Sequence, residues 1–223
     1  SYYINAPEGL VWMAKEVNKV GAQAANIFDN VTVYLTRDID MGGIEVTPIG
    51  DYASSRTMFR GTFDGQGHTI SGIYSRGAST YQGIFGIARE NSIIKNFSIK
   101  NSFFYKENTS LAGLGSVAGD SYGKVENIYS NAILISEGPQ VGGIIGRQND
   151  NDSNGKEDCM TISNCWFDGL VSLRGEKTME AGGIVGRAAS GLLVGTSYSG
   201  DNRRLPVVGG GMIGVNDGEL ILN

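Results

Sequence analysis

Short apolar stretches recur along the chain at a nearly regular interval. The clearest copies place two apolar residues directly before a glycine, in the segments 83–86, 116–119, 143–146, 183–186 and 211–214. Their final residues, Gly86, Gly119, Gly146, Gly186 and Gly214, are 33, 27, 40 and 28 residues apart. A repeat of roughly 20 to 50 residues is typical of solenoid proteins, in which each repeat forms one stacked unit.

A second pattern alternates with the first and consists of an aliphatic residue, any residue, and asparagine or glycine. It stands at 70–72, 94–96, 125–127, 162–164, 193–195 and 221–223. Asparagine and glycine adopt the left-handed backbone conformation at the least cost. We therefore predict a backbone corner at Asn96, Asn127 and Asn164, with short strands on both sides.

These patterns predict an all-β fold, a right-handed parallel β-helix in which each repeat is one coil. Equivalent aliphatic residues of successive coils would lie above one another at the strand spacing of about 4.8 Å. We expect two such ladders: Ile84, Val117, Ile144, Ile184 and Met212; and Ile70, Ile94, Val125, Ile162, Leu193 and Ile221. A β-sandwich with glycine turns is the alternative, but it does not explain a register kept over six copies.

The first residues predict a helix over 7–20 that covers the N-terminal end of the β-helix. Asn5 is the expected capping residue, Pro7 begins the first turn, and Gly21 is the expected stop. The apolar residues at helical spacing are Leu10, Met13, Ala14 and Val17. Residues 1–26 would form this cap region and 27–223 one continuous repeat domain, with further sequence or another chain covering the C-terminal edge.

Composition and charge limit the classes of partner. Glycine contributes 34 of 223 residues, which we attribute to turns. The net charge is −5, and the basic residues are scattered singly apart from the pair Arg203-Arg204. A surface that binds nucleic acid concentrates cationic side chains, so nucleic acid is not an expected partner. The chain has no apolar run of about 18 residues, so we expect no membrane insertion. Cys165 is expected to be a small buried residue, and its pairing with Cys159 stays open.

Several segments of the chain together resemble a known protein family. Thr47-Pro48-Ile49-Gly50, the segment from Phe59 to Ile70 and the Gly-Ile-Ile-Gly copies are similar to the GLUG-repeat proteins, and the similarity extends over nearly the whole chain. The copy at Ser116–Gly119 lacks the first glycine. The resemblance implies a β-helix in a secreted or surface protein of a bacterium, a class mostly described as adhesins. Some such modules accompany metalloproteases, but their His-Glu-x-x-His zinc motif cannot occur here because His68 is the single histidine.

The segment from Asp150 to Gly155 has the spacing of a calcium-binding loop. Oxygen ligands at alternate positions suit a hard cation, and a glycine permits the turn. The candidate ligands for Ca²⁺ are Asp150, Asp152, Asn154 and Asp158. Thr161 stands where a bidentate glutamate is usual, so a solvated loop rich in Asn and Asp is the alternative. No cofactor is required.

A candidate binding surface follows from the strand alternation. If Ile128 and Cys165 point inward, Tyr129 and Trp166 point outward at equivalent positions of adjacent coils. Tyr74 has the same offset from its own copy of the pattern, with Ser98 and Ser197 on the remaining rungs. Exposed aromatic faces suit sugar rings or a protein surface, although a self-packed stack is the alternative. Phe103, Phe104 and Tyr105 form a second aromatic group that the sequence does not orient.

We therefore predict a non-catalytic extracellular or cell-surface module for adhesion or ligand binding, whose partner is a glycan or protein of a host or bacterial surface. A polysaccharide-active enzyme is one alternative, with Asp64 and either Asp38 or Asp40 as its carboxylate pair. A structural spacer is the other. His68 is expected to form a turn hydrogen bond with Asp64 and to have no catalytic role.

Overall fold

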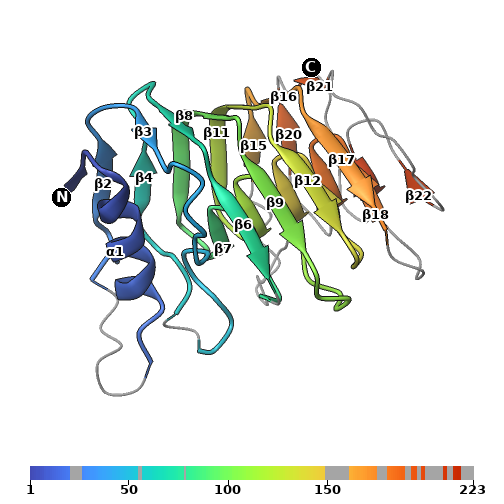
Figure 1. Ribbon diagram of the computed structural model, residues 1–223, viewed down its shortest axis with the longest axis horizontal. Coiled ribbons are helices and arrows are strands. Elements are labelled where there is room, and N and C mark those ends of the chain that lie inside the picture. Colours follow the sequence, from blue (N-terminus) through green and yellow to red (C-terminus); the bar gives the residue numbers. More distant parts are fainter. Residues whose placement is uncertain are drawn as a thin grey trace.

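The computed structural model describes residues 1–20, 27–54, 57–77, 79–148, 161–174 and 180–188, together with four short strands beyond residue 190. The chain folds as a parallel β-helix with one short helix at its N-terminus, as the repeats predicted (Figure 1). All strand pairings in the described part are parallel, and each strand pairs with its counterparts from neighbouring coils. The β-sandwich alternative is thereby excluded.

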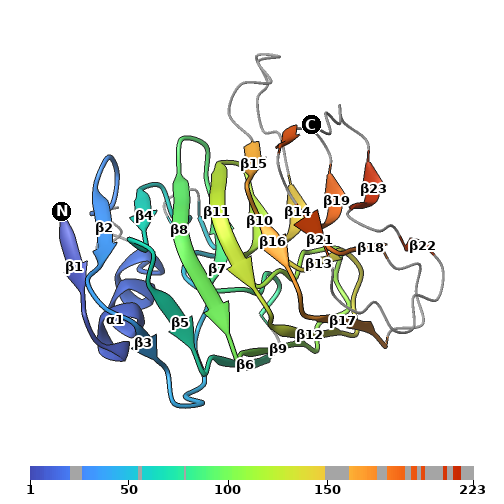
Figure 2. The same cartoon turned by 90° about the horizontal axis from the view of Figure 1, so that it is seen from above.

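Sheets A and B form consecutive walls of the coils. Sheet A contains, among the described residues, β1 (Tyr2–Ile4), β2 (Thr32–Leu35), β3 (Ile39–Asp40), β4 (Thr62–Asp64), β5 (Thr69–Ser71), β8 (Ile93–Lys100), β11 (Lys124–Ser130), β15 (Thr161–Ser163), β16 (Trp166–Phe167), β20 (Leu192–Val194) and β21 (Ser197–Tyr198). Sheet B follows after a corner in each coil, as Figure 2 shows, and contains β6 (Tyr74–Gly77), β9 (Phe103–Lys106), β12 (Ile133–Ser136) and β17 (Leu170–Leu173).

Two further walls close the coils. Sheet C contains β7 (Phe85–Ala88), β10 (Ala118–Ser121), β14 (Ile145–Gln148), β19 (Val185–Ala188) and β23 (Ile213–Asn216). Sheet D contains β13 (Val141–Gly142), β18 (Glu180–Gly182) and β22 (Val208–Gly209). In the part of the chain that the structure describes, no helix combines the length and apolarity needed to cross a membrane.

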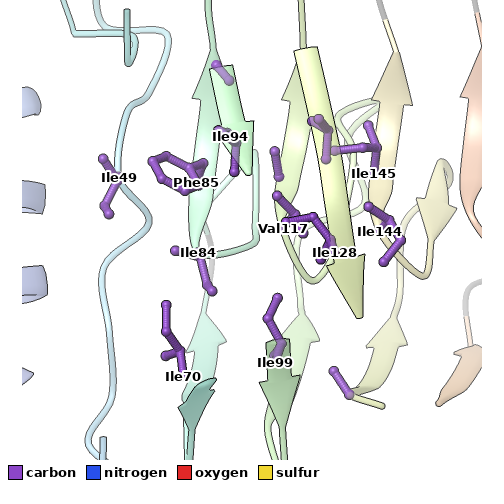
Figure 3. Close-up of a cluster of buried hydrophobic side chains, with 14 of the residues drawn as sticks. Ile49, Ile70, Ile84, Phe85, Ile94, Ile99, Val117, Ile128, Ile144 and Ile145 are labelled. Carbon is purple, nitrogen blue, oxygen red and sulfur yellow. The ribbon is translucent and has the colours of Figure 1, made fainter. Parts of the chain in front are cut away.

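The aliphatic ladders lie inside these walls (Figure 3). Ile84, Val117, Ile144 and Ile184 occupy successive coils and are at most 5% exposed. In the second ladder, Ile94 pairs with Val125 and Val125 with Ile162, and the backbone of Leu193 continues the series. Met212 and Ile221 lie outside the described residues.

The position predicted for Ile70 is wrong. Ile70 pairs with Ile99, whereas the residue that pairs with Ile94 is Phe63. The first full coil carries a turn at 65–68 that divides its sheet A strand into β4 and β5. Because each coil bends at both ends of sheet A, the 70–72 copy marks the second corner. Gly72 has φ 64° there and Asn101 has φ 48°.

The repeated glycines of sheet C have a different role from the turns that we expected. Gly86, Gly119, Gly146 and Gly186 lie within strands and lack positive φ values. A Cβ atom at Gly119 would lie 2.7 Å from the backbone nitrogen of Gln82 and 2.8 Å from the backbone oxygen of Gly113. These glycines therefore allow a second layer of backbone to pack directly against sheet C.

Helix α1 (Pro7–Val17) covers the N-terminal end of the core, as predicted (Figures 1 and 2). Its buried residues are Leu10, Met13, Ala14 and Val17, the four expected from helical spacing. The predicted cap is wrong, because the N-cap residue is Ala6 and no side chain caps the helix. The helix ends at Val17 and not at residue 20, and Gly21 lies outside the described residues. Asn18 joins the helix to the first coil, since its amide donates to Pro48 O at 2.9 Å and accepts from Gly50 N at 2.7 Å.

Candidate ligand-binding groove

A shallow groove follows the outer surface of sheet A across successive coils. The residues that line it and carry the argument are Gln66, Asn96, Asn127, Asn164, Tyr129 and Trp166. Gln66 comes from the turn between β4 and β5, and the other residues come from the corner and the strand that follows it in β8, β11 and the 164–167 segment. The repeat therefore places amides along one line and aromatic side chains beside them. We name this surface the sheet A groove.

The three corner asparagines form a hydrogen-bonded ladder along the groove. They lie in the left-handed conformation, with φ values of 60°, 55° and 51° for Asn96, Asn127 and Asn164. Asn127 Nδ2 donates to Asn96 Oδ1 at 2.8 Å, and Asn164 Nδ2 donates to Asn127 Oδ1 at 3.2 Å. The predicted stacking of the corners is thus confirmed.

Asp64 anchors the first rung of this asparagine ladder. Its Oδ1 accepts from Asn96 Nδ2 and from the backbone N–H of Gln66, both at 3.0 Å, and its Oδ2 lies 3.8 Å from Lys95 Nζ. An ionised acceptor strengthens the hydrogen bonds made to it. The amides are consequently held in fixed orientations, and each has a second N–H that the ladder bond does not use.

Two aromatic side chains stand beside the ladder. Tyr129 and Trp166 are paired residues of adjacent coils, as predicted, with Ser98 and Ser197 on the neighbouring rungs. Trp166 is 51% exposed, whereas Cys165 and Phe167 on either side of it are buried. Lys100 Nζ lies 5.9 Å from the centre of the Tyr129 ring.

Tyr74 does not belong to this surface, contrary to the sequence prediction. It lies in β6 of sheet B and stacks on Phe103, with ring centres 5.7 Å apart and ring planes at 13°. The prediction failed because Tyr74 was placed by its offset from the 70–72 copy, which marks the second corner. The structure also orients the second aromatic group, since Phe104 is buried and Phe103 and Tyr105 lie on the outer side of sheet B.

The candidate catalytic carboxylates accept hydrogen bonds from backbone N–H groups. Asp38 Oδ1 accepts from the Thr69 N–H at 2.9 Å, and Asp40 Oδ1 accepts from the Gly42 N–H at 2.9 Å. The Thr69 N–H, and after it the hydrogen bond to His68, lower the pKa of Asp38 below its ordinary value. A general acid in glycoside cleavage needs the opposite direction.

His68 contacts Asp38 and not Asp64, so the predicted turn hydrogen bond is wrong. Its Nδ1 lies 3.2 Å from Asp38 Oδ1. The reason is the stacking of coils: Ile39 pairs with Ile70, which brings the residues preceding each of them together. Asp64 is engaged by Gln66 and Asn96 instead.

The predicted calcium ligands Asp150, Asp152, Asn154 and Asp158 lie outside the described residues, as does Cys159. Within the described part of the chain, no group of three or more His, Cys, Asp or Glu residues is arranged to hold a metal ion. Cys165 is buried, as predicted, and its burial raises the pKa of the thiol to about 12.

The sequence predicted the corner geometry but missed the side-chain ladder. The missed signal was the occurrence of asparagine at three successive corners. Glycine would be sufficient for the left-handed backbone conformation, so the repeated asparagine indicates a role for the side chain. Only asparagine adds a donor and an acceptor that continue from coil to coil. Gln66 was missed for a different reason, since it lies in a turn outside the repeat.

Comparisons with known proteins give short matches. No family model and no solved structure matches the chain. An alignment over 95 residues to a Gly-rich membrane protein from Evansella cellulosilytica is 34% identical. It covers 42% of the chain and 10% of that protein. An alignment over 127 residues, which covers 52% of the chain and 1% of halomucin from Haloquadratum walsbyi, is 29% identical. The chain thus matches a tenth or less of the length of these relatives, and the resemblance to GLUG repeats stays a prediction.

Proposed function

We propose that this chain is a non-catalytic binding module of a bacterial cell surface, and that the sheet A groove binds a neutral glycan. The observation that carries the proposal is the pairing of the exposed Trp166 with the partly buried Tyr129 beside the asparagine ladder. Sugar rings combine apolar faces with hydroxyl groups at their edges. Aromatic rings suit the faces, and oriented amides suit the hydroxyls because they both donate and accept.

The rigidity of the coil supports the same function. The amides are held by the ladder, and the aromatic side chains stand on strands paired on both sides. Binding to a preformed surface orders few side chains, so less interaction energy is lost on association. Rungs spaced by about 4.8 Å repeat the asparagine amides along the solenoid axis, which suits an extended chain ligand.

Location at the cell surface or outside the cell is part of the proposal. It is supported by the names of the two relatives, a Gly-rich membrane protein and a halomucin. The partner would be a host or bacterial surface glycan. The backbone hydrogen bonds that Asp38, Asp40 and Asp64 accept favour binding over cleavage.

A glycan array followed by calorimetry tests the proposal. We expect Trp166→Ala to weaken binding of the captured glycan at least tenfold while leaving the melting temperature nearly unchanged, because the indole is half exposed. Tyr52→Ala is the matched control, since Tyr52 is 64% exposed and lies outside the groove. The proposal fails if the wild-type protein captures no glycan, or if Trp166→Ala binds as tightly as the control variant does.

A further inference from the structure

A half-enclosed cavity of about 240 Å³ lies between helix α1 and the first coils. Leu10 and Ala14 line it from the helix, and Met41, Ile49, Ile73 and Ile84 line it from the coils. All six of these side chains are at most 6% exposed. The cavity shares no lining residue with the sheet A groove.

The smallest buried residue of the helix, Ala14, lines the cavity. On the face of α1 that covers the core, Leu10, Met13 and Val17 are large, but Ala14 has only a methyl group. Asn18, just beyond the end of the helix, holds that end against Pro48 and Gly50. The gap lies beside Ala14.

The lining determines what kind of molecule fits. The polar part of Asn18 is engaged by the first coil. The charged lining residues Lys15 and Glu45 are exposed and lie at the rim. A buried charge would find no partner among the apolar walls, and its desolvation would oppose binding. The part of a ligand that enters the cavity must therefore be apolar and uncharged.

The volume of the cavity limits the size of the ligand. An engineered apolar cavity of about 150 Å³ stays dry and accepts benzene. The present cavity is larger, at about 240 Å³, and is open on one side. A flat molecule with one or two aromatic rings would contact both the helix and the coil wall.

We propose that this cavity is a binding site for a small uncharged aromatic molecule of one or two rings. Occupancy would restore the dispersion contacts that the lining side chains lack and would hold α1 more firmly on the β-helix. The site is separate from glycan binding, so either proposal can fail without the other.

Titration with indole, followed by NMR and by thermal melting, tests the site. We expect saturable shifts confined to signals of the lining residues, together with a higher melting temperature in the presence of indole. Ala14→Leu should fill the gap, raise the melting temperature of the free protein and weaken indole binding at least tenfold. Val46→Phe fills the same cavity from the coil side and serves if the helix variant does not fold.

Glu8→Leu is the matched control, because it adds the same side chain to an exposed position of α1 that does not line the cavity. This variant should bind indole like the wild-type protein. Three results would each overturn the site: no saturable binding by the wild-type protein, indole binding unaffected by both filling substitutions, or shifts that spread over residues remote from α1.

Discussion

At the scale of single residues, the corner asparagines combine two properties that are usually separate. Asn127 adopts a left-handed backbone conformation with φ 55°, and its side chain bonds to the corners of both neighbouring coils. The backbone property is available to glycine, whereas the ladder requires an amide. Substitutions at this position can therefore separate the two contributions to stability.

We expect Asn127→Ala to destabilise the protein more than Asn127→Gly. Both variants lose the ladder hydrogen bonds, but only alanine adds the left-handed strain, which costs on the order of 1–2 kcal/mol. Urea unfolding of the three proteins measures the difference. Equal free energies of unfolding for the two variants would show that the corner conformation carries no strain.

Residue types at the corners were the most predictable feature of this chain. Asn96, Asn127 and Asn164 were placed correctly because a left-handed residue is a local requirement, and local requirements are visible in sequence. Tyr74 and Ile70 were misplaced because both ends of sheet A use the same residue types. Sequence alone does not distinguish one corner from the other.

At the scale of elements, the glycines of sheet C determine how closely two layers of backbone approach. Gly119 in β10 faces the backbone atoms of Gln82 and Gly113. A bridge joins Gln82 to Leu114, and another joins Leu114 to Val141, so this second layer continues from coil to coil. The absence of a side chain at Gly119 therefore allows this second layer of backbone to lie close to sheet C.

Gly119→Ala should therefore destabilise the protein, although alanine is acceptable in a strand. The added Cβ meets backbone and cannot be relieved by a rotamer change, so we expect a loss of about 1–3 kcal/mol. Thermal or urea unfolding measures the loss. Ser172→Ala in β17 is the control, because Ser172 lies on the outer side of sheet B and its substitution should be nearly neutral. A neutral Gly119→Ala would contradict the close packing of the layers.

At the scale of the whole molecule, the buried charge of Lys106 makes the stability depend on pH. Lys106 in β9 is fully buried, and its Nζ donates to Ser110 O at 2.9 Å. Burial lowers the pKa of Lys106 from 10.5 to about 8, partly offset by the charge of Asp120. Below pH 8 the folded and unfolded states both carry the proton. Between about pH 8 and 10.5 only the unfolded state keeps it, so stability rises with pH.

We expect Lys106→Met to be most favourable relative to the wild-type protein near pH 7, and its advantage to shrink as the pH rises above 8. The charged lysine costs on the order of 3 kcal/mol in the folded state at neutral pH. Urea unfolding of both proteins from pH 7 to 9.5 measures the difference. Comparison of the two proteins cancels the opposing contributions of Tyr122 and Cys165, whose pKa values burial raises to about 12. A difference that is constant with pH would contradict this assignment.

The β-helix, its N-terminal helix and the pairing of Tyr129 with Trp166 followed from the sequence alone, because residues with fixed backbone preferences recur at a period that places equivalent side chains in register. The tertiary structure decided what depends on contacts between coils. The pairing of Ile70 with Ile99 showed that the 70–72 copy is the second corner, so that Tyr74 lies in sheet B beside Phe103. The asparagine ladder and the cavity beside Ala14 likewise depend on neighbours about thirty residues away in sequence or more. A local sequence pattern does not predict contacts between residues so far apart in the chain. These contacts depend on the length of the loop between one coil and the next, which sets the register.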